Sequence, residues 1–452
     1  MTKLPMAVEA RTDELTPEQR DVLLARRPSG EGELRQAVAE LLREVARDGD
    51  RALVRMARDF DGVELEALEV PRARWDQALD SLDPQLRADL ERAARNIEVF
   101  HRAQIPGEVR VEVEPGLVLG RRTTPLPAVG VYAPGGRAAY PSSVLMGVVP
   151  ARAAGVPQIV VCSPPGPDGL PPEAVMAACA LGGATRLFAL GGAGAVAALA
   201  RGTESVPRVE AIVGPGNQWV TEAKRQVAGE LRIDSPAGPS EVLVVAGPGA
   251  DPARVAAELV AQAEHDPEAA VAAVSWSTPL LAAVRTELAR QVADSPRREI
   301  VETALERRGG LLEAPDRAAA LAFAEDYAAE HLALYTDDPR ADLDTQTTAG
   351  TVFVGEDATV AFGDYLTGAN HVLPTSGRSR SFSGLSVLEF LRFHTWQELT
   401  PAAARSLAGP TGRLADLEGL PGHARAARMR GNEAGLRPGA PLDPQAPGET
   451  SP

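Results

Sequence analysis

The chain has 452 residues, of which 44% are hydrophobic, and its formal net charge at pH 7 is −16. Because single hydrophobic cores stop growing near ~250–300 residues, this length predicts two or more domains. The acidic balance argues against nucleic acid or an anionic membrane as the main partner.

The first hundred residues are predicted to be helical. Apolar residues recur at helical spacing over 31–48, and the same spacing returns over 83–100. His101, directly after the second of these helices, is interpreted as a surface or capping residue.

Between 126 and 220 short apolar strands alternate with helix-like stretches. Each strand runs into a turn rich in glycine or proline; the strands are Pro127–Tyr132, Gln158–Cys162, Arg186–Leu190 and Val209–Val213. Such alternation predicts a parallel sheet covered by helices on both faces. In open sheets of this kind, ligands bind at the carboxyl ends of the strands, where all of these turns lie.

Two of these turns partly match the dinucleotide-binding fingerprint. They read G-A-G-A-V-A at 192–197 and G-P-G-N-Q-W at 214–219. A glycine turn that opens a helix exposes backbone N–H groups that suit a pyrophosphate. Each match alone is weak, since tight turns between strand and helix are common. Nucleotide binding and a purely structural role therefore both stay open at this point.

A second alternating region extends from 241 to 362, with strands predicted at Val242–Ala246, Ala270–Trp276, Leu332–Tyr335 and Thr351–Val354. The helix after the first of them has Asp251 as N-cap and Pro252 at its first position, and Pro267 follows its end. From Val387 the chain is expected to be helical again, including 401–407 and 411–430. Residues 437–452 are rich in Pro and Gly without periodicity, which predicts a disordered tail.

The cysteines and the N-terminus point to an ordinary intracellular protein. Cys162 and Cys179 form no C-x-x-C pair, so neither a thiolate zinc site nor a disulfide framework is indicated. Both are expected in the core, since free cysteine buries readily. No signal-peptide pattern and no apolar run of ~18–20 residues is present. We therefore predict a soluble, cytoplasmic protein with no membrane partner.

Side chains typical of a metal site lie in separate segments. Gln262 and His265 are three residues apart and project from one helix face. Asp364 lies in a glycine-containing loop, and His423 lies in L-E-G-L-P-G-H. Two imidazoles, one carboxylate and one amide oxygen suit Zn²⁺ or Mn²⁺. No H-E-x-x-H or cysteine spacing marks the site, so a helix-terminal cation stays the alternative role for His265.

Glu330 and His331 open the strand H-L-A-L-Y. A carboxylate and an imidazole at a strand end can reach one cleft and relay protons near neutral pH. A cap plus a surface histidine stays the structural alternative. His371 and His394 are interpreted as structural.

Taken in order, these motifs resemble those of the histidinol dehydrogenase family. The resemblance extends from about residue 30 to 430 and rests on I-D-S-P-A-G-P-S-E at 233–241, Q-A-E-H-D at 262–266, G-P-G-N at 214–217 with Ala223-Lys224, A-A-E-H-L at 328–332, G-D-Y-x-x-G-x-N-H-V-L-P-T-S-G at 363–377 and G-L-S-V at 384–387. The ordered set is highly specific, although no single motif is.

The resemblance implies an enzyme of the last step of histidine biosynthesis. Such an enzyme oxidises L-histidinol through the aldehyde to L-histidine with two NAD and one water. One Zn²⁺ per subunit, which Mn²⁺ can replace, and a homodimer with a cross-subunit active site are implied as well. The implied fold is α/β, with two incomplete Rossmann-like domains of parallel sheets flanked by helices, plus helical N- and C-terminal arms. The expected boundaries are an N-terminal arm at 1–28, an α/β domain at 29–130 and 242–386, a nucleotide-binding domain at 131–241 and a C-terminal arm at 387–436 that completes the partner's site.

The family's functional residues carry over onto matching positions of this chain. The implied zinc ligands are Gln262, His265, Asp364 and His423. The implied acid–base pair is Glu330 and His331. The implied substrate contacts are Ser240, Gln262, His265, His331, Asp364, Glu418 and His423. The implied NAD contacts are Tyr132 and Asn217.

Two positions depart from the family pattern. Gly194 stands where the family usually has Gln in a glycine turn, and Ala329 stands where Pro often precedes Glu-His. The nearest alternative is a paralogous zinc- and NAD-dependent dehydrogenase of another small alcohol, such as a sulfonated diol. A metal-dependent hydrolase and a non-catalytic nucleotide-binding protein are more distant alternatives.

Overall fold

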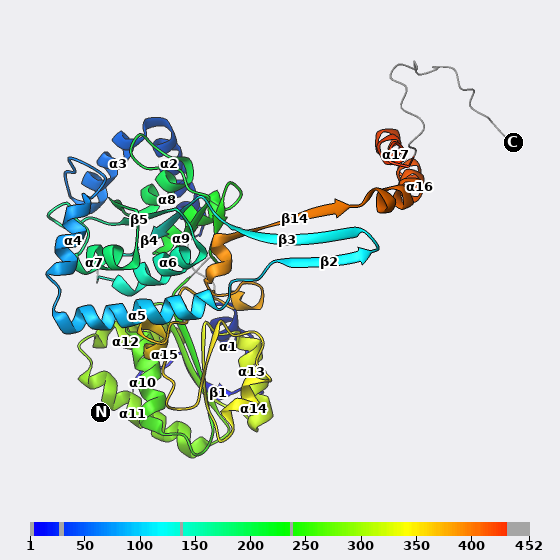
Figure 1. The fold of residues 1–452 in the computed structure, drawn as a ribbon. Coiled ribbons are helices and arrows are strands. Elements are labelled where there is room, and N and C mark those ends of the chain that lie inside the picture. The colour runs from blue at the N-terminus through cyan, green and yellow to red at the C-terminus, as the bar shows by residue number, and fades with distance from the viewer. Residues whose placement is uncertain (1–3, 27–30, 136–138, 236–237, 432–452) are drawn as a thin grey trace. The chain divides into compact units, whose positions relative to one another are not determined.

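A computed structural model describes residues 4–26, 31–135, 139–235 and 238–431 (Figure 1). The chain divides into two compact units, Met1–Ile105 with Pro125–Leu391, and Pro106–Thr124 with Arg392–Pro452. The tail predicted at 437–452 lies outside the described residues. None of the helices in the described residues is long and apolar enough to cross a membrane.

The first unit contains a six-stranded parallel sheet with the order β1-β11-β10-β9-β12-β13. Its strands are β1 (Val8–Arg11), β9 (Glu241–Ala246), β10 (Ala270–Ser275), β11 (Gly309–Glu313), β12 (His331–Tyr335) and β13 (Thr351–Val354). Every residue of β9, β10 and β12 is buried. Parallel strands that are buried on both faces read as continuous apolar runs, which is why the sequence shows them.

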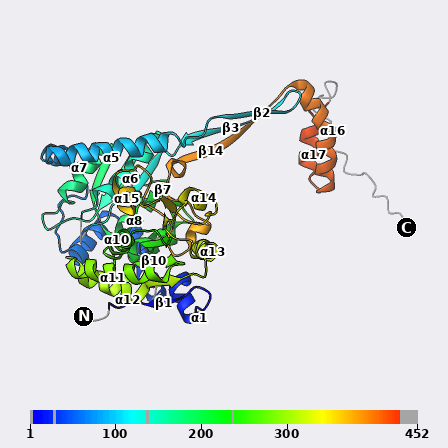
Figure 2. The same ribbon diagram turned by 90° about the horizontal axis from the view of Figure 1, so that it is seen from below.

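Helices cover both faces of this sheet (Figures 1 and 2). Alternate residues of β9 belong to different clusters, because successive side chains point to opposite faces. Val242 and Val244 pack with α10 (Pro252–Ala263), α11 (Thr278–Asp294) and α12 (Arg298–Arg308). Leu243 and Val245 pack with α13 (Arg317–Tyr327). The remaining helices of this half are α14 (Pro339–Leu343) and α15 (Val360–Tyr365).

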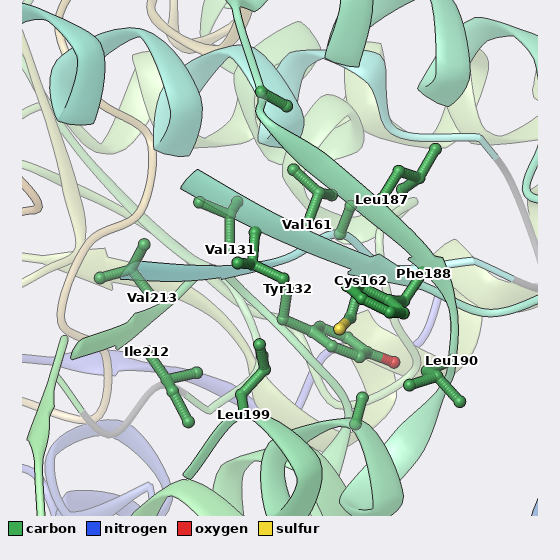
Figure 3. Packing of buried hydrophobic residues seen from close by; sticks show 14 of the residues in the cluster. Val131, Tyr132, Val161, Cys162, Leu187, Phe188, Leu190, Leu199, Ile212 and Val213 are labelled. Carbon is green, nitrogen blue, oxygen red and sulfur yellow. The ribbon is translucent and has the colours of Figure 1, made fainter. Parts of the chain in front are cut away.

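The first unit also contains a five-stranded parallel sheet with the order β6-β5-β4-β7-β8. Its strands are β4 (Ala128–Tyr132), β5 (Gln158–Ser163), β6 (Arg186–Ala189), β7 (Ala211–Val213) and β8 (Arg232–Ile233), and the helices that follow them are α6 (Pro141–Ala154), α7 (Glu173–Gly182), α8 (Gly192–Arg201) and α9 (Gln218–Val227). Figure 3 shows apolar side chains of the central strands packed with Leu199 of α8. Cys162 and Cys179 are fully buried, as predicted, and burial raises the pKa of both thiols.

The N-terminal region is largely helical, as predicted. Its helices are α1 (Pro17–Arg20), η1 (Asp21–Ala25), α2 (Glu31–Asp48), α3 (Asp50–Met56), η2 (Ala57–Asp61), α4 (Arg72–Asp80) and α5 (Pro84–Arg102). Of the two roles predicted for His101, the surface position is wrong, because the residue is 1% exposed; its Nδ1 lies 2.8 Å from the Ile97 carbonyl oxygen in the last turns of α5, as a capping role expects. Together the two sheets and their helices confirm the α/β class with parallel sheets flanked by helices. The predicted domain boundaries stay predictions.

The second unit is built from a three-stranded sheet and two helices. The sheet has the order β14-β3-β2, with β2 (Val109–Glu114), β3 (Leu117–Pro125) and β14 (Leu391–Leu399), and the helices are α16 (Pro401–Leu417) and α17 (Pro421–Arg428). The helix expected over 387–393 is wrong beyond the short 3₁₀ turn η4 (Val387–Phe390), whereas α16 and α17 confirm the helices expected at 401–407 and 411–430. In β14, Phe393 contacts Arg121 of β3, and Trp396 packs on Gly120, so cross-strand packing overrides the helix-like apolar spacing.

Candidate active site

The predicted acid–base pair lies at the amino-terminal edge of the six-stranded sheet. Glu330 directly precedes β12, and His331 is its first residue. Strand β12 pairs with β9, with His331 opposite Val242, so that Glu241 at the start of β9 lies beside both residues. Ser240, which precedes β9, is half-buried at the same edge.

The backbone of Glu241 holds both members of the pair. Its N–H donates to Glu330 Oε2 at 2.7 Å, and His331 Nδ1 lies 3.0 Å from its carbonyl oxygen. A carbonyl oxygen only accepts, so His331 Nδ1 carries the hydrogen and Nε2 presents a lone pair. Glu330 and His331 are 5% and 3% exposed, and His331 Nδ1 lies 3.5 Å from Glu330 Oε2.

Burial sets the protonation of this pair. Burial lowers the pKa of His331 to about 4, so its ring is neutral at pH 7. Burial, together with the charge of Glu241, raises the pKa of Glu330 well above the usual range for a glutamate. A neutral imidazole and a carboxyl group of raised pKa are both suited to accept and return protons in a shielded site.

Asp364 lies next to this pair. Its Oδ1 is 3.8 Å from His331 Nε2, and burial raises the pKa of its carboxyl group to about 7. Two groups outside the predicted site fix the helix α15 that carries it. Glu258 Oε2 accepts the N–H of Val360 at 3.1 Å, and His371 Nδ1 lies 3.0 Å from the Asp364 carbonyl oxygen.

His371 is closer to the site than its structural interpretation suggested. After burial, positive charge on His371 also lowers the pKa of His331. Burial lowers the pKa of His371 to about 4, and positive charge on His265 lowers it as well. Its Nε2 lies 3.3 Å from Ser143 Oγ. The signal for this placement was present in the motif G-D-Y-L-T-G-A-N-H, which carries Asp364 and His371 together.

The end of α10 brings Gln262 into position for a ligand. Gln262 is 2% exposed, and neither its amide oxygen nor its amide nitrogen has a hydrogen-bond partner among the described residues. A buried amide without partners costs about 1–3 kcal/mol, so this group fits a ligand that is bound in the working enzyme. His265 follows two residues after the helix and is exposed.

The predicted metal ligands are divided between the two units. Across the described ranges, no group of three or more His, Cys, Asp or Glu side chains is placed to hold a metal ion. Glu418, at the C-cap of α16, and His423, in α17, belong to the second unit, where both are exposed. The donor types still fit zinc, since a buried amide, an imidazole and a carboxylate are suitable ligands.

The predicted NAD contacts lie at the carboxyl edge of the five-stranded sheet. Tyr132 ends β4, is buried, and its hydroxyl accepts the N–H of Gly192 at 3.2 Å (its side chain is labelled in Figure 3). Burial raises the pKa of Tyr132 to about 12. Asn217 is the exposed N-cap of α9, and its Oδ1 accepts from Trp219 and Val220. The turns that open α8 and α9 follow β6 and β7, and because all strands of this sheet are parallel, both turns lie on one edge.

Gly194 faces α3. A Cβ at this position would lie 2.9 Å from Met56 Sδ and 3.5 Å from Leu53 Cδ2. Any longer side chain at position 194 therefore requires Met56 to move.

Comparison with known proteins shows which family this chain resembles. A family model described as histidinol dehydrogenase matches residues 24–431. The chain is 45% identical over 393 residues to the histidinol dehydrogenase of Methanothermobacter thermautotrophicus, which covers 87% of this chain and 92% of that protein. It is 46% identical over 426 residues to that of Halobacterium salinarum, covering 94% and 99%. The crystal structure of histidinol dehydrogenase from Elizabethkingia anophelis superimposes with a TM-score of 0.89 at 32% identity, covering 94% of this chain and 98% of that one.

Proposed function

The chain belongs to the histidinol dehydrogenase family, and on this premise we propose that it oxidises L-histidinol through L-histidinal to L-histidine with two NAD⁺. The observation that carries the proposal is the buried pair Glu330–His331, which Glu241 holds beside Asp364. A hydrolase needs no hydride acceptor, whereas this chain presents glycine turns and helix N-termini on a separate sheet edge that suits a dinucleotide.

In the first oxidation, His331 Nε2 accepts the hydroxyl proton of the substrate as a hydride leaves the carbinol carbon for the nicotinamide. The Glu241 carbonyl oxygen keeps the opposite ring nitrogen protonated, so Nε2 is free to accept. The products of this step are the aldehyde, NADH and one proton.

In the second oxidation, Glu330 takes a proton from the water that attacks the aldehyde carbon. The resulting hydrate gives up a second hydride to a second NAD⁺, and the carboxylate forms. The two steps together consume one water and two NAD⁺ and release two NADH and three protons. The raised pKa of Glu330 makes its carboxylate a stronger base than an exposed glutamate. Both cysteines are buried in the core, which supports a route without a thioester.

We propose Gln262, His265, Asp364 and His423 of the partner subunit as the zinc ligands. Zinc, when bound, supplies a template that fixes the imidazole and amine of the substrate. The unpartnered amide of Gln262 is the feature of this chain that supports the assignment most directly. Ser240 and Glu418 of the partner subunit are proposed as substrate contacts, Glu418 for the substrate ammonium group.

A homodimer completes the site in this proposal. The helices of the second unit expose apolar side chains, with Leu414 at 64%, Leu417 at 84% and Leu420 at 41%. Exposed apolar side chains gathered on a small helical unit are typical of a surface that another chain covers. An active protein that stays strictly monomeric and still depends on His423 would rule out the cross-subunit site.

The direct test is an assay of NADH formation with L-histidinol. We expect two NADH for each histidinol consumed, loss of activity after removal of the metal, and recovery with Zn²⁺ or Mn²⁺. The Glu330→Gln variant is expected to lose the second half-reaction, assayed with histidinal, more than the first. NADH formation with a sulfonated diol and none with histidinol would favour a paralogous dehydrogenase instead. Full activity in protein verified to be free of metal would contradict the role of zinc.

A further inference from the structure

An arginine far from the catalytic pair in sequence is buried behind it. Arg26 follows η1, has φ +42° and is 3% exposed. Its guanidinium group lies 3.9 Å above the Tyr327 ring, and Nη2 donates to the Tyr327 carbonyl oxygen at 2.6 Å. Nη1 lies 3.2 Å from Glu241 Oε2. The predictions from sequence gave no role to Arg26 or to Glu241.

Glu241 links this arginine to the catalytic pair. Its side chain is 2% exposed and is held by Arg26 on one oxygen and by the Ser376 N–H on the other, at 2.6 Å. Its backbone N–H and carbonyl oxygen hold Glu330 and His331 at 2.7 Å and 3.0 Å. One residue therefore carries a buried negative charge on its side chain and both anchoring contacts of the pair on its backbone.

A buried carboxylate needs a compensating charge to stay where it is. Without a partner it takes up a proton or moves toward water, because removing a charge from water is costly. Arg26 forms an ion pair with Glu241; burial raises the pKa of Glu241, and the charge of Arg26 lowers it more than the charge of Arg308 does. Loss of Arg26 would therefore displace the Glu241 side chain or cause it to take up a proton. A shift of Glu241 would also move its backbone N–H and carbonyl oxygen, which anchor Glu330 and His331.

We propose that Arg26 is a positioning residue for the oxidation chemistry, which acts through Glu241 to hold Glu330 and His331 in place. This inference rests on the proposed roles of Glu330 and His331. Geometry matters steeply here, since a misplacement of about 1 Å can lower a rate by on the order of 100-fold. Arg26 touches neither substrate nor cofactor in this account, so its loss lowers turnover and leaves substrate binding nearly unchanged.

The test compares Arg26→Met with a matched control in the purified full-length enzyme. Arg186 also pairs with a carboxylate, Glu69, and stacks on a ring, Phe188, but it starts β6 away from the pair. Arg26→Met is expected to lower kcat by roughly 10–100-fold, with KM for histidinol and NAD⁺ changed by less than about threefold. Arg186→Met is expected to lower the melting temperature and to keep kcat within about twofold of the wild type. A kcat for folded Arg26→Met within twofold of the wild type overturns the proposal.

A second variant covers the case in which Arg26→Met does not fold. Arg26→Met/Glu241→Gln removes both buried charges, so no charge is left without a partner. Its kcat is expected to fall at least fivefold at nearly constant KM, because the ion pair between Arg26 and Glu241 is gone and only the Ser376 N–H still holds the side chain at 241; a wild-type kcat overturns the proposal. Glu330→Gln, measured in parallel, separates a failure of the proposed function of Glu330 and His331 from a failure of the inference about Arg26. If Glu330→Gln is fully active, the proposed function of the pair fails, and this inference fails with it. If Glu330→Gln is impaired and the double variant is not, the inference about Arg26 fails alone.

Discussion

Replacing Lys224 by Met removes one half of a buried ion pair that holds the turn before α9. Lys224 is 2% exposed, pairs with Asp234, and donates from Nζ to the Gly214 carbonyl oxygen at 2.9 Å. Asp234 Oδ2 accepts the Gly214 N–H at 2.7 Å. Gly214 has φ +112°, and a Cβ there would lie 2.1 Å from the Tyr132 carbonyl oxygen, so the turn has little room to relax. Removing one partner of a buried pair costs about 3–5 kcal/mol, which is the loss of unfolding free energy that we expect at pH 8.

The loss in this variant should depend on pH. Burial raises the pKa of Asp234, and Lys224 acts against that rise. Without Lys224 the pKa rises further, so the folded variant holds a proton that the unfolded chain releases above its ordinary pKa of ~3.9. When the folded state binds more protons, stability increases as the pH falls. The difference from the wild type is therefore largest at pH 8 and shrinks toward pH 5.

Urea unfolding followed by tryptophan fluorescence measures this difference, and Trp219 in α9 reports on the turn itself. Lys224→Met/Asp234→Asn is the control, and it should recover most of the lost stability because no charge remains unpaired. The dissociation constant for NAD⁺ should rise at least ~5-fold in the single variant, because a mispositioned binding group loses affinity steeply. A loss below about 1 kcal/mol at pH 8, or a loss that is independent of pH, would refute the reasoning.

Three further predictions concern the metal and cofactor regions. Glu258→Ala leaves the Val360 N–H without its acceptor and the Tyr335 hydroxyl with only the Ala358 carbonyl oxygen at 3.5 Å, which should cost about 2–4 kcal/mol in urea unfolding and lower the zinc retained after dialysis; unchanged zinc content would contradict it. Gly194→Gln should lose about 1–3 kcal/mol against Met56, and Met56→Ala in the same chain should restore part of it; a double variant no more stable than the single one would exclude that contact. Because the pKa of Asp364 is about 7 without metal and a ligand carboxylate must be ionised, Zn²⁺ affinity should fall roughly tenfold per pH unit below 7, with proton release in calorimetry; affinity independent of pH would argue against Asp364 as a ligand.

Most strands of both sheets were predictable because strands buried on both faces appear in the sequence as continuous apolar runs. β4, β5, β9 and β10 are apolar runs with glycine, proline or serine within two residues after them, and each appears where the sequence placed it. β8 has only two residues, and β11 begins with Gly309-Gly310, so neither forms a recognisable apolar run. β14 was mispredicted because its apolar residues fit a helical spacing, while its partners on β3 are remote in sequence.

The candidate site was predictable where chemistry-bearing side chains stand in a motif. Asp364 and His331 were both selected from sequence, and their side chains lie 3.8 Å apart. Arg26 and Glu241 could not be selected, because nothing local marks them. Their importance follows from the pairing of β9 with β12, which places the Glu241 backbone against Glu330. The burial of His101 could not be predicted for the same reason: a histidine at a helix end gives no sign that tertiary packing will bury it.

The central claim is that one chain carries half of an active site and a second chain completes it. Glu330→Gln and His423→Asn, each expected to lack NADH formation from histidinal, test it when they are mixed, dissociated and reassociated and are then assayed with histidinal. In a cross-subunit site the hybrid dimer holds one intact site, so the mixture should regain about one quarter of wild-type NADH formation, as random pairing of two-fold dimers gives. If each site is built from a single chain, every site in the mixture keeps one defect, and the absence of recovered activity would contradict the account.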